Sequence, residues 1–232
     1  MLADAVRRVA GMVRSPRATL AGAIANPQPL GLALVIVTIS TACSVGFLLT
    51  RVGQLAALDQ QVRQIESFGT VVTDETYAEL RDLVPYRPAI SAAVILIGWP
   101  VGWLALSGAL QYFGNRTGNG HATFAQVLTI VVHASAIFAV RALVAVPVNY
   151  ARESLGGATS LSMVLPSFSE STFPARLFGA LDVFVLWWVV LVALGLSLLY
   201  RTRTLPIARW LFGAYAAGAV ALALTQALRG GV

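Results

Sequence analysis

The sequence contains no lysine and little charge of either sign. Asp, Glu, Lys and Arg make up only 11% of its 232 residues, whereas they make up about 25% of an ordinary soluble domain. All sixteen basic residues are therefore Arg, which fits a GC-rich bacterial genome. Because 57% of the residues are hydrophobic, the composition excludes a typical soluble domain and predicts a membrane protein, in a bacterial cytoplasmic membrane.

Few residues in the chain can carry chemistry. The single thiol, Cys43, lies in an apolar run, which excludes an intramolecular disulfide and a thiolate metal cluster. The sequence contains no G-x-S-x-G or H-E-x-x-H motif. The arginines are scattered between apolar runs, so the net charge of +6 does not predict nucleic-acid binding. We expect no enzyme, no metal and no cofactor.

Long apolar stretches set the fold class. At about 1.5 Å per residue, a helix of some 20 residues crosses a hydrocarbon core of roughly 30 Å. The sequence predicts an all-α polytopic membrane protein in which residues 30–228 form a five-helix bundle. The predicted spans are 30–50, 89–113, 122–148, 177–200 and 205–228.

Residues 1–29 predict basic amphipathic helices at the membrane surface. Between residues 2 and 14 the apolar positions share one helical face, and Arg7, Arg8 and Arg14 lie on the opposite face. Each Arg near anionic lipid would contribute about 1 kcal/mol. The alternative is that the apolar face packs on the protein's own spans.

Residues 51–88 predict a soluble helical insertion. Apolar residues recur at helical spacing in its first half, at Leu55, Leu58, Val62 and Ile65, so we expect the first span to continue out of the membrane as an amphipathic helix. Thr73 can cap a second helix. Four Arg against six acidic residues make this segment acidic.

Small residues predict close helix packing in two spans. Gly98 and Gly102 flank Pro100, which predicts a bent and tightly packed second helix; a substrate gate is the alternative. Gly213 and Ala217 give the fifth span a small-residue face. Such faces favour a homo-oligomer or a subunit of a membrane complex.

The ionisable residues within the predicted spans include His133, Arg141 and Asp182. Arg141 and Asp182 are expected at similar depth in antiparallel neighbours, so we predict an ion pair that fixes helix register; the alternative is that Arg141 snorkels outward. His133 has no acid or second His at ligand spacing, so we interpret it as a hydrogen-bonded structural residue, with a proton relay as the alternative.

Arginine placement favours an inside amino terminus and an outside carboxyl terminus. With this orientation the inner segments carry seven Arg and one acidic residue, and the outer loops carry six Arg and eight acidic residues. The Arg counts alone barely discriminate, and the density of Arg beside the first span decides the prediction.

Several segments resemble the Yip family, five-span membrane proteins named for interaction with Ypt/Rab GTPases. The most specific is LDVFVLWWVVLVALGLSLLYRTRTLPIARW, which is similar to that family's fourth-to-fifth span hairpin. Supporting similarities are VRSPRATLAGAIANP, GHATFAQVLTIVVHAS and TSLSMVLP. Together they cover residues 12–43 and 105–228.

This resemblance implies a non-enzymatic scaffold that contacts membrane lipids, organises membrane or recruits partner proteins, and commonly oligomerises. A small GTPase is an expected partner only if the chain is eukaryotic; in a bacterium only the membrane-organising part transfers. Arg141, Asp182 and the mid-span Pro100 motivate an alternative, a small-solute transporter or an accessory subunit of a transport complex. Five unlike spans do not supply the repeated halves that are usual in transporters.

Overall fold

A computed structural model describes residues 2–117, 121–155, 157–161 and 173–229. The described residues form helices and one isolated β-bridge. The helices are α1 (Leu2–Arg14), α2 (Pro16–Ala25), α3 (Leu30–Leu48), α4 (Arg51–Ser67), α5 (Asp74–Asp82), η1 (Val84–Tyr86), α6 (Arg87–Ala93), η2 (Val94–Gly98), α7 (Trp99–Thr117), α8 (Phe124–Ala134), α9 (Ala136–Ala151), α10 (Phe173–Ala180), α11 (Val183–Leu199) and α12 (Thr204–Arg229).

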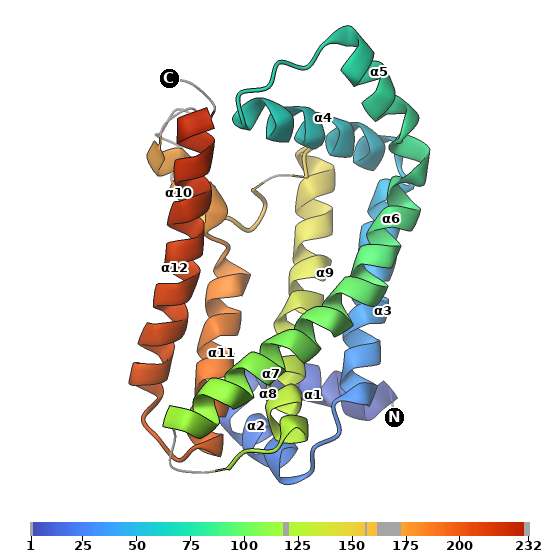
Figure 1. The fold of residues 1–232 in the computed structure, drawn as a ribbon. Coiled ribbons are helices and arrows are strands. Elements are labelled where there is room, and N and C mark those ends of the chain that lie inside the picture. Colours follow the sequence, from blue (N-terminus) through green and yellow to red (C-terminus); the bar gives the residue numbers. More distant parts are fainter. Residues whose placement is uncertain (1, 118–120, 156, 162–172, 230–232) are drawn as a thin grey trace.

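The long helices run between two ends of different charge (Figure 1). At one end lie α1, α2, the last turn of α7 and the turn from α11 to α12; we call it the basic end. At the opposite end, α4 lies across the bundle beneath α5; we call it the acidic end, because α4 and α5 carry six exposed acidic residues, Asp59, Glu66, Asp74, Glu75, Glu79 and Asp82. The two chain termini lie at opposite ends, as an odd number of spans requires.

The predicted all-α membrane bundle is confirmed. Four helical stretches are long and apolar enough to cross a membrane: Leu30–Leu48, Asp74–Thr117, Phe124–Ala151 and Thr204–Thr225. The fifth apolar helix, Val183–Leu199, has 17 residues and would extend about 26 Å at 1.5 Å per residue. It is shorter than the predicted span 177–200, because the chain leaves helical geometry at Leu181 and Asp182 before α11 begins.

Two other spans are interrupted rather than continuous. The second passes through the π-helical turn η2, two residues before Pro100. Proline has no N–H and its ring crowds the carbonyl four residues earlier, here that of Leu96, which explains a widened turn at this point. The third span breaks at Ser135, which separates α8 from α9.

The first span does not continue into α4, in contrast to the prediction. It ends at Leu48, and Thr50 caps α4 by accepting a hydrogen bond from the Gly53 N–H at 3.0 Å. A Cβ on Gly53 would overlap the Phe47 carbonyl group, so the turn needs glycine at this position. Arg87 holds α4 from the other side by donating to the Ala57 carbonyl and the Gln61 side chain.

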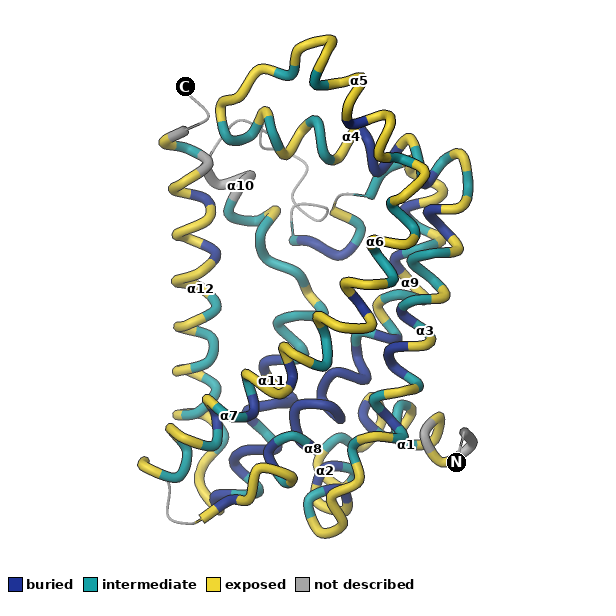
Figure 2. Tube along the Cα trace, turned by 45° about the vertical axis from the view of Figure 1, so that its right-hand side comes forward, coloured by how far each residue is buried: buried dark blue, intermediate teal, exposed yellow. Residues whose placement is uncertain are grey.

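The buried core lies towards the basic end, where most of α8 and the second half of α11 are buried (Figure 2). The apolar faces of α7 and α12 point outward, as expected for helices in contact with lipid. Within the described chain Gly102 and Gly213 have open space where a Cβ would lie, and Gly98 meets only Val94 of its own helix turn. Ala217 is also exposed, so these small residues pack on no other helix of the same chain.

Candidate functional site: a polar cavity at the acidic end

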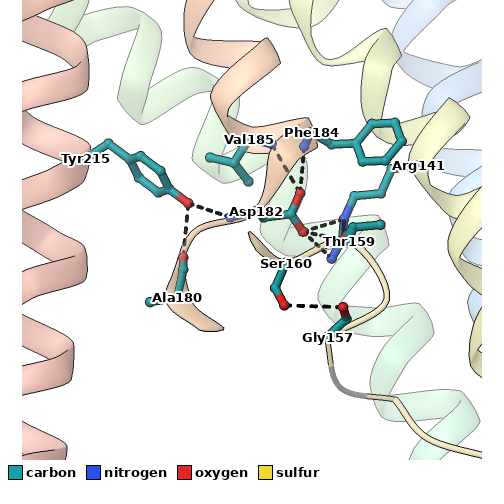
Figure 3. Close-up of polar contacts among 9 residues, drawn as sticks. All are labelled: Arg141, Gly157, Thr159, Ser160, Ala180, Asp182, Phe184, Val185 and Tyr215. Atoms are coloured by element: carbon teal, nitrogen blue, oxygen red, sulfur yellow. Dashed lines mark hydrogen bonds and ion pairs between the residues drawn. The ribbon is translucent and has the colours of Figure 1, made fainter. Parts of the chain in front are cut away.

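Arg141 of α9 and Asp182 at the start of α11 form an ion pair (Figure 3). The Arg141 Nη2 and Nε atoms lie 2.9 and 3.0 Å from Asp182 Oδ2. Thr159 completes the cluster, because its hydroxyl accepts from Arg141 Nε at 3.1 Å and donates to Asp182 Oδ2. The Arg141 side chain is 44% exposed and that of Asp182 16%, so the charges are paired at the edge of the protein interior.

Asp182 also lies at the end of the short non-helical stretch that precedes α11, and it caps this helix. Its Oδ1 atom accepts from the backbone N–H groups of Phe184 at 2.8 Å and Val185 at 3.3 Å, which makes it the N-cap of α11. The Tyr215 hydroxyl of α12 accepts from the Asp182 N–H and donates to the Ala180 carbonyl. The Asp182 carboxylate therefore joins α9 to α11, and the Asp182 backbone N–H joins this junction to α12 (Figure 3).

An extended segment brings Thr159 to this carboxylate. Ser160 forms an antiparallel bridge with Asp182, in which Leu161 N–H donates to the Leu181 carbonyl and Val183 N–H donates to the Thr159 carbonyl. Two backbone hydrogen bonds thus hold the connection after α9 against the start of α11. The sequence analysis missed Thr159 and Tyr215. Thr159 carries one signal, since it begins the segment TSLSMVLP of the family resemblance.

The cluster forms part of the wall of a cavity of about 420 Å³ between α3, α9 and residues 157–160. Several other polar side chains line it, among them Ser40, Ser44, Gln60 and Asn149. Ser40 Oγ and Asn149 Oδ1 are buried and have no hydrogen-bond partner among the described residues. A buried polar atom without a partner costs about 1–3 kcal/mol, so a polar molecule in the cavity would relieve this cost.

A comparison with protein-family models finds the Yip1 domain over residues 10–226. The chain belongs to the Yip1 domain family. No curated protein and no solved structure matches it. The Yip1 domain match includes all the long apolar helices and both partners of the ion pair, and it begins within α1.

Helix α1, in which the Yip1 match begins, is tied to the bundle by a second polar contact. Arg8 of α1 donates from Nη1 to Nε2 of His133 at 3.3 Å, and His133 Nδ1 lies 2.8 Å from the Thr129 carbonyl oxygen. Both distances fit one neutral tautomer, in which Nδ1–H donates and Nε2 accepts. His133 is fully buried, and these bonds satisfy both of its ring nitrogens.

Of the three arginines predicted at the membrane surface, Arg7 and Arg14 are exposed and Arg8 is turned inward. Arg8 also binds Asp4 at 3.0 Å, so its charge is shared between an acid and the buried imidazole. Met12 of α1 is fully buried, and Val9 packs on the core. Of the predicted apolar face of α1, Val9 packs on the protein's own helices, whereas Val6 and Val13 are 54% and 42% exposed and remain available to the membrane surface.

Proposed function

We propose that this Yip1-domain protein is a non-enzymatic membrane scaffold that recruits a partner protein at its acidic end. The observation that carries the proposal is the surface of α4, α5 and their connection. All six of its acidic side chains are exposed. Val71 and Tyr77 are 83% and 42% exposed on the same surface. Acidic groups around exposed apolar side chains fit a basic partner protein, since complementary charge steers association and apolar contacts supply affinity.

Affinity purification of the full chain in mild detergent, with mass spectrometry of the associated proteins, tests this function. We expect a defined partner that is retained by the wild type and lost from the double variant Tyr77→Ala/Glu79→Gln. The matched control is Arg17→Gln, an exposed substitution in α2 at the basic end. If the same proteins accompany all three chains, or if the wild type emerges as a lone monomer, the scaffold function is wrong.

Solute transport is the second candidate, and the polar cavity favours it. The third span breaks at Ser135, and the fourth begins only after the non-helical residues Leu181 and Asp182; discontinuous helices are a feature of transporter binding sites. Asp182→Asn would keep an N-cap acceptor but remove the charge beside Arg141. Loss of solute uptake in a folded Asp182→Asn variant that still binds its partner protein would favour transport over scaffolding.

A further inference from the structure

A second cavity, of about 540 Å³, lies at the basic end between α7, α11 and α12. Its body is apolar and is lined by Leu110, Phe113, Leu196, Ile207, Trp210 and Leu211. Its polar groups come mainly from the turn between α11 and α12: Tyr200, Thr202 and Arg203. The cavity is therefore an amphipathic groove, and its volume falls within the range of roughly 300–1,000 Å³ that is usual for small-ligand sites.

Aromatic residues place the polar end of this groove at a membrane interface. The rings of Phe113 and Trp210 meet across it at 6.1 Å between centroids, and both side chains are about half exposed. In the last turns of α7, the guanidinium carbon of Arg116 lies 4.4 Å from the centre of the Tyr112 ring. Trp and Tyr are enriched where headgroups meet the hydrocarbon core, and Arg extends to this level. The apolar body then lies at the depth of the acyl chains.

The end of the bundle around the groove carries cationic charge without a protein counter-ion among the described residues. Arg203 lines the groove, and Arg116 and Arg201 belong to the same end of the bundle. All three are exposed, and none of them pairs with an acidic residue in the part of the chain that the structure describes. A groove with an apolar body and a cationic rim complements an anion that carries a hydrocarbon chain.

We propose that this groove is a binding site for an anionic phospholipid of the leaflet at the basic end. One acyl chain lies along the apolar body between α7 and α12, and the phosphate is bound by Arg203. Such a lipid would fill the space between α7 and α12, whose direct contact includes the Phe113–Trp210 ring pair. The site is distinct from the polar cavity at the acidic end, and it does not depend on the scaffold function.

Native mass spectrometry of the full chain in detergent tests the site. The protein is incubated with equal amounts of phosphatidylglycerol and phosphatidylcholine that have the same acyl chains. We expect wild-type protein to retain phosphatidylglycerol preferentially. Loss of a charge-assisted hydrogen bond in Arg203→Gln should weaken phosphatidylglycerol binding about tenfold, with little change for phosphatidylcholine. The control Arg209→Gln removes an exposed Arg from α12, six residues further along the chain, at a position that does not line the groove.

A substitution in the apolar body of the groove distinguishes a site that binds a whole lipid from a site that binds only phosphate. Ile207→Trp should weaken binding of both lipids by filling the groove, and Arg203→Lys should keep the preference because it keeps the charge. Equal retention of both lipids by the wild type, or equal loss in Arg203→Gln and Arg209→Gln, would overturn the proposal. It would also be overturned if excess inorganic phosphate displaced the lipid and Ile207→Trp had no effect. Melting temperatures identify variants that do not fold. If Ile207→Trp does not fold, the comparison of Arg203→Gln with Arg209→Gln tests the lipid site.

Discussion

Trp103 of α7 and Trp188 of α11 share one hydrogen-bond acceptor, the hydroxyl of Ser135. Their indole Nε1 atoms lie 3.0 and 3.1 Å from Ser135 Oγ, which itself donates to the Val131 carbonyl at 2.8 Å. Ser135 is fully buried at the break between α8 and α9. A single hydroxyl thus joins three spans in the part of the bundle where the core is densest.

Ser135→Ala should destabilise the protein more than an ordinary buried Ser substitution. It leaves two indole N–H groups without an acceptor, at a cost of about 1–3 kcal/mol each, so we expect a loss of roughly 2–6 kcal/mol in the free energy of unfolding. The measurement is equilibrium unfolding in mixed detergent micelles. Ser107→Ala is the control, because Ser107 is fully buried and its Oγ has no partner among the described residues. Equal stability of the two variants would contradict the shared-acceptor role.

The sequence was sufficient to predict the helical class and the order of the spans, because hydrophobicity over about 20 residues needs no tertiary information. It did not reveal the breaks at Ser135 and Leu181, because a break within a buried bundle is compensated by distant partners such as Trp103 and Tyr215. The start of α11 could have been predicted from Asp182, because an Asp directly before an apolar run is typical of a helix N-cap.

The two polar contacts illustrate the same limit. Arg141 and Asp182 could be matched by depth, since antiparallel neighbours place such residues near each other. Thr159 could not, because it lies in an irregular segment whose path depends on the β-bridge at Ser160. Arg8 was predicted to lie at the membrane surface, because helical periodicity does not show that His133 offers an acceptor on another helix.

A double-mutant cycle on Arg141 and Asp182 should show coupling. Arg141→Gln and Asp182→Asn each remove one charge, and each leaves the other charge without its ionic partner. We expect a coupling energy of about 1–3 kcal/mol between the two sites, measured by unfolding of the single and double variants in detergent. Arg152→Gln is the control, since Arg152 is an exposed residue at the end of the same helix. If the stability lost in the double variant equals the sum of the losses in the two single variants, the pair does not fix the register of α9 and α11.

Gly53→Ala should disturb the turn that sets α4 across the bundle. The new methyl group would overlap the Phe47 carbonyl, and overpacking of this kind costs about 1–3 kcal/mol. We expect a lower melting temperature and faster proteolysis within residues 51–88. In Gly46→Ala the added methyl group meets open space on α3, so this control should be neutral or slightly stabilising. Unchanged proteolysis in Gly53→Ala would show that the turn tolerates a side chain.

The outward small-residue faces predict association with a second copy of the chain. Gly213 and Ala217 lie one helical turn apart on an exposed part of α12, where they would allow close approach of another helix. Gly213→Leu should reduce the native mass of the particle in mild detergent from an oligomer to a monomer. Gly218→Leu makes the same change elsewhere on the exposed surface of α12 and should leave the mass unchanged. If the wild type is already a monomer, or if both variants keep the oligomer, this face is not the contact.

The charge difference between the two ends predicts the orientation in the membrane. Arg14 and Arg17 lie at the basic end beside the first span, so by the positive-inside rule we expect this end to lie on the cytoplasmic side. In a Cys43→Ala background, a membrane-impermeant maleimide should label Glu75→Cys in spheroplasts and label Ala18→Cys only after lysis. Both positions are exposed, so access to the thiol reports the side of the membrane and not burial. Labelling of Ala18→Cys before lysis would reverse the orientation. The proposed lipid site would then lie in the outer leaflet and the acidic surface would meet cytoplasmic partners.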